Sequence, residues 1–236
     1  MKDNLLILKE YVRRVLRESA PSDVSSLAAL VREEGENRVI LFRYDTIYSS
    51  LSRRKDDEDL FNFLLENIKN SIVGYGVFGP PDKGEAYGAW EVTHAAAPGL
   101  GKILYGIGYA LSPTGLLMPD RHTVSPDAEQ AWKKASKDRE GEKLDGLPPN
   151  NKTKDNFDDA ELHSKKGKEF LDVAYKAQGW ERGMTARLIA QGKTALKELA
   201  DDVNRDESAI RNAFFAMGTQ FFRDQYSAML KRKDPA

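Results

Sequence analysis

The sequence predicts an α/β (α+β) protein in which a mixed sheet is flanked by helices and followed by a helical C-terminal extension. Three observations lead to this prediction. Short apolar runs typical of strands occupy residues 39–44, 71–78, 87–95 and 115–118. Apolar residues at helical spacing occupy 56–69 and 103–111, between those runs. Beyond residue 159 the helical pattern continues through 170–177, 184–199 and 209–230.

Composition excludes several classes of function. The 36 Lys and Arg balance 37 Asp and Glu, so the bulk charge gives no strong nucleic-acid signal. There is no cysteine, which excludes disulfides, thiolate catalysis and thiolate metal sites. The three histidines have no ligand spacing, so we expect no metal. No apolar run reaches the about 18 residues of a transmembrane segment, and we expect a soluble protein.

The N-terminal part is predicted to be helical. Residues 4–18 form an amphipathic basic pattern that ends at Pro21. Such a helix either docks on its own domain or acts as an arm that binds a partner, a lipid surface or nucleic acid. A second helix is expected over 25–33, followed by a turn at Gly35.

The segment that carries chemistry is a glycine loop between a predicted strand and a predicted helix. The loop reads Pro98-Gly99-Leu100-Gly101-Lys102 and is followed at once by the apolar residues of the helix. The first turn of a helix has amide groups without an internal partner and a positive dipole end, which together bind anions. Glycine allows the backbone to approach a phosphate closely.

Two common nucleotide-binding motifs are excluded by their spacing. A Walker loop needs a glycine where Ala96 stands and a hydroxyl residue where Ile103 stands. The G-x-G-x-x-G sequence at residues 74–79 runs into Pro80 and Pro81 and does not open a helix, as a dinucleotide fingerprint requires.

The loop resembles the signature of the GCN5-related N-acetyltransferase (GNAT) superfamily, Q/R-x-x-G-x-G/A between the fourth strand and the third helix. Here the hexad is residues 96–101, in which both glycines match and Ala96 replaces the leading Gln or Arg. The longer pattern W-E-V-T-x-x-A-A, G-x-G-K-x-L-Y and L-M-x-D-R-x-x-V-S-P-x-A is similar to GNAT-like proteins of tailed bacteriophages. This resemblance covers residues 38 to 140.

The resemblance implies that acetyl-CoA is the acyl donor and that the site lies on the fourth strand and in the loop. The residues it indicates for binding acetyl-CoA are Val92, Thr93, Gly99, Leu100, Gly101, Lys102 and Ile103. Glu91 is the candidate base and Tyr105, with Tyr109 as alternative, the candidate acid. These residues also have structural interpretations. Glu91 could be a solvated strand residue and Tyr105 part of the core, and His94, on the same strand as Glu91, could be a structural hydrogen-bonding residue. Strand alternation predicts that Trp90, Val92 and His94 share one face.

The predicted organisation has four parts. Residues 1–20 form the basic helix, 21–140 the GNAT-like domain, 141–160 a polar linker and 161–236 a helical subdomain packed against the sheet. Because residues 133–159 are polar, we expect the two closing strands of a GNAT sheet to be missing or displaced.

Two functions from different classes follow. The first is an acetyl-CoA-dependent N-acetyltransferase with an unknown amine acceptor. The second is a catalytically inactive, GNAT-like structural or virion-associated phage protein that contacts phage or host proteins. Location in the host cytoplasm or in the virion is an expectation that follows from the phage resemblance.

Overall fold

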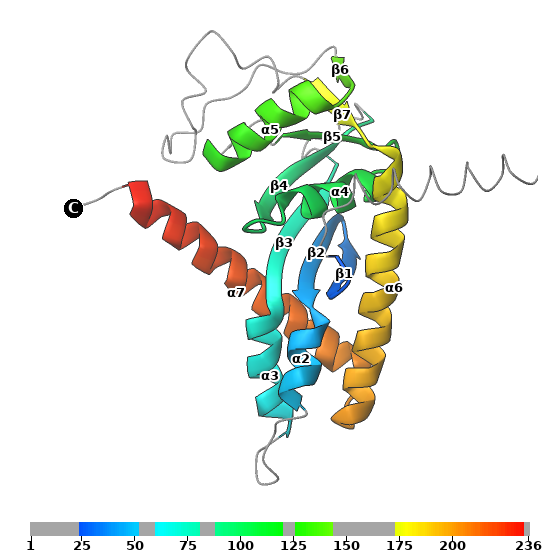
Figure 1. Ribbon diagram of the computed structural model, residues 1–236, viewed down its shortest axis with the longest axis vertical. Helices are drawn as coiled ribbons and strands as arrows, with labels where there is room; N and C mark the ends of the chain where they lie inside the picture. Colours follow the sequence, from blue (N-terminus) through cyan, green and yellow to red (C-terminus); the bar gives the residue numbers. More distant parts are fainter. Residues whose placement is uncertain (1–23, 52–59, 81–87, 120–125, 144–172, 234–236) are drawn as a thin grey trace, which may run out of the picture.

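The computed structural model describes residues 24–51, 60–80, 88–119, 126–143 and 173–233 (Figure 1). The predicted N-terminal helix and residues 144–160 of the predicted linker lie outside the described residues. The strands are β1 (Leu27–Glu34), β2 (Glu36–Arg43), β3 (Ile72–Gly79), β4 (Trp90–Ala96), β5 (Leu116–Pro119), β6 (Gly141–Lys143) and β7 (Val173–Lys176). The helices are α2 (Tyr44–Leu51), α3 (Leu60–Ser71), α4 (Gly101–Leu111), α5 (Pro126–Asp138), α6 (Gly179–Asp202) and α7 (Glu207–Lys233).

The predicted fold class is confirmed. The described strands form one mixed sheet in the order β1-β2-β3-β4-β5-β7-β6. Neighbouring strands are antiparallel except for β4 and β5, which are parallel. The strands expected from the apolar runs, the helices at 56–69 and 103–111, and the turn at Gly35, where φ is +76°, are all found within about two to four residues of their predicted bounds.

The helix predicted over residues 25–33 is wrong, because this segment is strand β1. Leu27 and Ala29 lie in the core beside α4, whereas Ala28 and Leu30 lie in the core beside α7. Burial that alternates between two faces is the pattern of a strand covered on both sides. Tertiary burial therefore outweighs the helical preference of this leucine- and alanine-rich run.

The prediction that the closing strands are missing or displaced is also corrected. A helix is expected over residues 170–177, of which 170–172 lie outside the described residues, but Val173–Lys176 form strand β7, which pairs with β5 and β6. Strand β6 lies inside the segment predicted to be a polar linker, and all three of its residues are exposed. An exposed strand of three residues has no apolar alternation, and the sequence therefore gives no signal for it.

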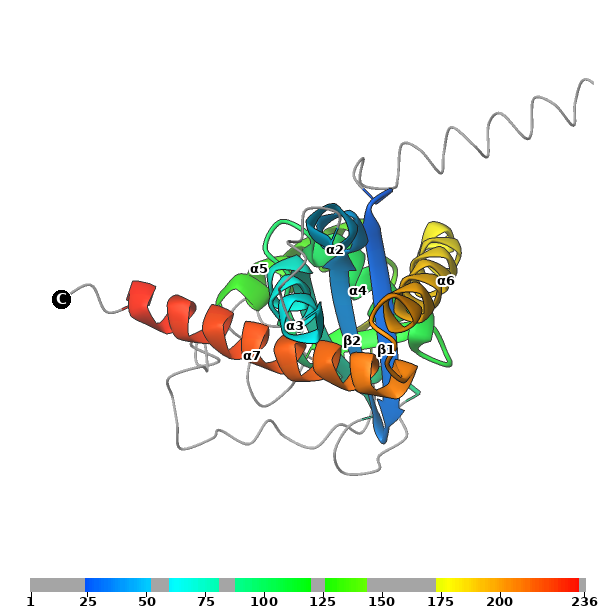
Figure 2. The same cartoon turned by 90° about the horizontal axis from the view of Figure 1, so that it is seen from below.

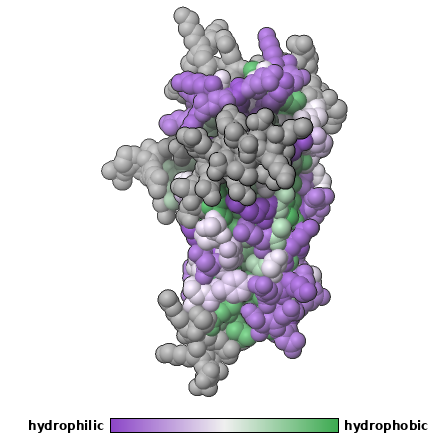
Figure 3. Space-filling model, turned by 45° about the vertical axis from the view of Figure 1, so that its right-hand side comes forward, coloured by the Kyte–Doolittle hydropathy of each residue, from purple (hydrophilic) through white to green (hydrophobic). Residues whose placement is uncertain are grey.

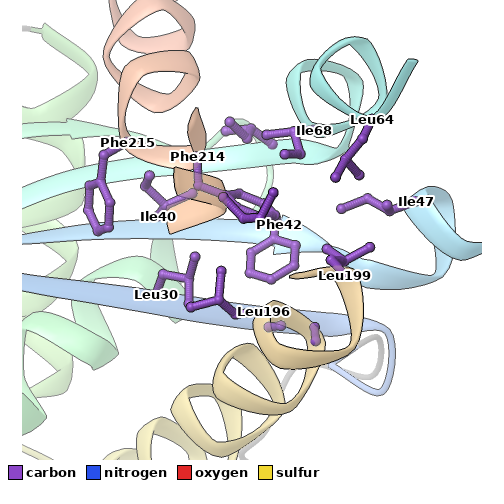
Figure 4. Packing of buried hydrophobic residues seen from close by; sticks show 14 of the residues in the cluster. Leu30, Ile40, Phe42, Ile47, Leu64, Ile68, Leu196, Leu199, Phe214 and Phe215 are labelled. Carbon is purple, nitrogen blue, oxygen red and sulfur yellow. The ribbon is translucent and has the colours of Figure 1, made fainter. Parts of the chain in front are cut away.

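Two hydrophobic clusters fill the two faces of the sheet. The α4-side core contains Ile103, Leu104 and Ile107 of α4 together with Trp132 of α5 and Leu188 of α6. The α7-side core joins α2, α3, α7 and the second half of α6, and Figure 4 shows its packing. Its labelled members are Leu30, Ile40, Phe42, Ile47, Leu64, Ile68, Leu196, Leu199, Phe214 and Phe215. Of the aromatic residues of α7, Phe214 and Phe215 belong to this core, and Phe221 and Phe222 pack against it.

Helix α6 lies along strand β1 at the edge of the sheet (Figures 1 and 2). A Cβ atom at Gly192 would lie 2.1 Å from the carbonyl oxygen of Ala29, so only glycine permits this approach. Figure 3 shows hydrophilic residues gathered at both ends of the face that it views. Covering β1 with a helix protects an edge that could otherwise pair with another chain.

A buried ion pair joins the helices to the second half of the sheet. Glu181 of α6 is fully buried, and its Oε1 lies 2.5 Å from Nη2 of Arg139, which follows α5. Arg139 also donates to the carbonyl oxygen of Lys176 in β7 at 3.0 Å, and its guanidinium covers the ring of Tyr109 at 4.0 Å. Glu181 accepts a bond from the amide of Gln178 at 2.6 Å. One pair therefore connects α4, α6 and β7.

Replacing Gly192 tests the approach of α6 to β1. We expect Gly192→Ala to lower the free energy of unfolding by about 1–3 kcal/mol, because the new methyl group overlaps backbone atoms. Gly183→Ala in the same helix is the matched control, since a Cβ there meets nothing within 4 Å. The control should raise stability by about 0.5–1 kcal/mol in urea unfolding. Equal effects of the two substitutions would contradict the close approach.

Removing Arg139 tests the buried ion pair. We expect Arg139→Met to cost about 3–5 kcal/mol in urea unfolding, because the carboxylate of Glu181 stays buried without its partner. The double variant Arg139→Met, Glu181→Leu should lose less than the single variant, since it buries no charge. A double variant that is less stable than Arg139→Met would contradict this account.

Candidate functional site

The site lies where β4 loses its second neighbour. β3 pairs with β4 from Glu91 to Ala96. β5 pairs only with Trp90, Glu91 and Val92, through Leu117, Met118 and Pro119, and within the described residues this pairing ends there. The second half of β4, residues 93–96, is therefore open toward β5, and we call it the open half of β4.

A β-bulge changes the faces to which β4 residues point. Val77 pairs with His94 and Phe78 pairs with Val92, which leaves Thr93 as the extra residue. Val92 and Phe78 lie in the α4-side core, whereas His94 makes a ring contact with Phe222 on the other face. The prediction that Trp90, Val92 and His94 share one face is thus wrong for His94, because a bulge shifts the alternation by one residue.

The glycine loop leads from the open half of β4 into α4. The amide of Leu100 donates to the carbonyl of Ala97 at 2.9 Å, and Gly99 adopts a φ of +73°. Helix α4 then begins at Gly101 without a side-chain hydrogen bond at its N-cap. The amides of Gly99 and Gly101 donate no hydrogen bond to any described residue. These amides remain available for an anion.

The space outside the loop is open. A Cβ atom built at Gly99 or at Gly101 would meet nothing within 4 Å. The side chains of Leu100 and Ile103 instead pack in or against the α4-side core, and their amides bond within the loop and the first turn. These two residues fix the turn, while the glycines face outward.

Lys102 lies in the first turn of α4 and is exposed. Its ammonium nitrogen is 5.0 Å from the ring centroid of Trp180, the second residue of α6. A cation held over an aromatic ring is stabilised by about 0.5–1 kcal/mol at exposed sites. The charge of Lys102 is therefore held near the start of α4 by a residue of the C-terminal region.

The two predicted catalytic residues lie on opposite faces of the sheet. Glu91 is buried and shares its face with Met118, its partner in β5. Tyr105 belongs to α4 and packs edge-to-face on Trp132, with ring centroids 5.5 Å apart. Thr93, at the bulge, donates from its hydroxyl to the carbonyl of Val77 at 3.4 Å. The packing of Tyr105 therefore fits the alternative interpretation, in which its side chain is part of the core.

Burial keeps the tyrosine hydroxyls of α4 protonated. It raises the pKa of Tyr105 from 10.0 to about 12. Burial also raises the pKa of Tyr109, although the nearby guanidinium of Arg139 opposes this shift. The buried hydroxyl of Tyr109 has no hydrogen-bond partner among the described residues. Tyr105 can therefore act as a proton donor at neutral pH but not as a base.

A separate hollow of about 460 Å³ lies at the start of α6. Thr114, Lys176, Gln178 and Arg182 are among its lining residues, and none of the predicted site residues is. The described residues contain no group of three or more His, Asp or Glu that could hold a metal ion. Within the same residues, no helix has the length and apolar character needed to cross a membrane.

Alkaline titration tests the burial of Tyr105. Because the folded pKa is raised, the neutral hydroxyl stabilises the fold fully below pH 10, and this contribution is lost as the pH rises from 10 toward 12. We expect the difference in tyrosinate absorbance between the wild type and Tyr105→Phe to appear near pH 12. A difference that titrates near pH 10, the value of a solvated tyrosine, would contradict burial of this hydroxyl.

Comparison with known proteins identifies no relative of this chain. No protein-family model, no curated protein and no solved structure matches it. Function is therefore argued from the site itself and from the motif that it carries.

Proposed function

We propose that this protein is an acetyl-CoA-dependent N-acetyltransferase that transfers an acetyl group to an amine. The observation that carries the proposal is the start of α4, directly after the open half of β4. The amides of Gly99 and Gly101 donate no hydrogen bond to any described residue there, and a Cβ at either glycine would meet nothing within 4 Å. A diphosphate is the kind of anion that such a helix start binds.

The order of elements supports the resemblance to the GNAT superfamily. The glycine hexad lies between the fourth strand and the third described helix, as in the superfamily signature. A fifth strand and a helix follow, and β7 and β6 then complete the sheet as its two closing strands. The sequence predicts that these two closing strands are missing or displaced, and their presence supports an enzyme.

The loop differs from the superfamily signature in ways that reduce its hydrogen-bond donors. Ala96 has no polar side chain where the signature has Gln or Arg, and Pro98 has no amide hydrogen. The amide of Leu100 is used within the turn. The phosphate cradle therefore depends on the amides of Gly99 and Gly101, with the charge of Lys102 beside them.

The chemistry of the transfer divides between the two faces of the sheet. Acetyl-CoA supplies a thioester whose carbonyl carbon accepts the amine, with cleavage of the carbon–sulfur bond. In the proposed roles, Glu91 removes a proton from the amine on one face. Backbone amides near Val92 and Thr93 stabilise the oxyanion. Tyr105, which burial keeps protonated, donates a proton toward the leaving sulfur from the α4 side.

Thermal unfolding with acetyl-CoA tests the proposal, with ATP as control ligand. At a concentration 100 times the dissociation constant, acetyl-CoA should add about 2.7 kcal/mol of stability. For a chain of this length that corresponds to about 5–10 °C in melting temperature. Gly101→Trp should abolish the shift, because its side chain fills the open space outside the loop. Gly183→Trp is the matched control and should retain the shift, since its site is equally open but lies in α6.

The outcomes separate the two classes of function. A shift lost only in Gly101→Trp supports the transferase. No shift at millimolar acetyl-CoA overturns the proposal and favours the alternative, a GNAT-like structural or virion-associated phage protein. Detection of the chain in purified phage particles would then test that alternative directly.

A further inference from the structure

Helix α7 crosses the first four strands of the sheet on the face opposite α4. Over β1, the guanidinium of Arg32 lies 4.2 Å from the ring centroid of Phe215. At β2 a Cβ at Gly218 would lie 2.8 Å from Cδ1 of Ile40, so the helix approaches the sheet closely. The helix reaches β4 at Phe222, whose ring lies 4.9 Å from that of His94. Beyond this point α7 continues past the sheet (Figure 2).

The contact with β4 falls on its open half. The bulge at Thr93 turns His94 toward α7, and pairing of β4 with β5 has already ended at Val92. His94 is exposed despite its contact with Phe222. Phe222 thus stands beside His94, the residue that follows Val92 and Thr93, whose amides the proposed function assigns to the oxyanion.

The side of α7 that faces the sheet here is aromatic. The ring of Phe222 lies 5.8 Å from that of Tyr75 in β3 and stacks on that of Tyr226 at 6.1 Å. Arg223 and Asp224 are exposed, so the charged residues of this turn lie on its outer side. Aromatic faces attract ammonium groups, and their rings pack against apolar bodies.

We propose that α7 provides the acceptor side of the site and selects an amine with an aromatic body. Phe222 and Tyr226, together with His94, receive the acceptor on the face of β4 opposite α4. This inference rests on the proposed function, because the acyl donor defines which part of β4 matters. The glycine loop concerns only the acyl donor, whereas this inference assigns the acceptor to the C-terminal helix α7.

Calorimetric titration of the CoA-saturated protein tests the inference without turnover. The probe is 2-phenylethylamine, with ethylamine and phenylacetate as controls that lack the ring and the ammonium group. We expect 2-phenylethylamine to bind at least tenfold more tightly than either control. Phe222→Ala should weaken the binding of 2-phenylethylamine about tenfold, because the variant loses one aromatic ring that contacts the ligand near its ammonium group. Phe221→Ala is the matched control, because it removes the same side chain from the same turn, and should change binding less than threefold.

Each outcome decides the inference. Failure of 2-phenylethylamine to bind, equal binding of phenylacetate, or equal losses in Phe222→Ala and Phe221→Ala would overturn it. The acetyl-CoA melting shift, measured on the same protein, reports the proposed function separately. A retained shift in Phe222→Ala with weakened amine binding shows that the fold and the donor site are intact.

Discussion

The proposed site depends on one constraint: the two neighbours of β4 pair with it over different lengths. β3 pairs with β4 to Ala96, whereas the described pairing with β5 ends at Val92. A strand that keeps one neighbour remains fixed in position, yet its other edge has unpaired backbone groups. Helix α4 begins five residues after β4 ends, and its first turn therefore lies close to this edge. A strand edge and a helix start, both with polar backbone groups, thus adjoin one another.

The C-terminal region completes this arrangement and is not a separate addition to it. Strand β7 pairs with β5, and Trp180 of α6 holds Lys102 at the start of α4. The Arg139–Glu181 pair connects α6 to β7. Removing either partner would leave the other charge buried without compensation and destabilise the fold. The predicted division at residue 161 separates segments that share one sheet. Long-range packing, which a linear pattern does not contain, makes them one structure.

Local signals predicted the parts of the fold that depend on local chemistry. The apolar run before the loop, the two glycines and the amphipathic α4 were each readable from neighbouring residues. Three features were not. Leu27 to Leu30 favour a helix until both faces are covered, β6 is wholly exposed, and the bulge at Thr93 leaves no mark in composition. The face of His94, and with it the contact to Phe222, follows only from the register of β3 on β4.

The glycines around α4 separate packing from binding. A Cβ at Gly108 would lie 2.5 Å from the ring of Phe78, so packing explains this glycine. At Gly106 a Cβ would lie 3.1 Å from Cε of Met184, a close contact with the end of a flexible side chain. Gly99 is explained by its φ of +73°. Gly101 has neither a positive φ nor a neighbour within 4 Å, and alanine there would favour the helix. Gly183 of α6 shares both properties, so the lack of a neighbour does not itself identify a ligand site. What distinguishes Gly101 is its place in the first turn of α4, where its amide donates no hydrogen bond to any described residue, and this is the group that the proposed phosphate site uses.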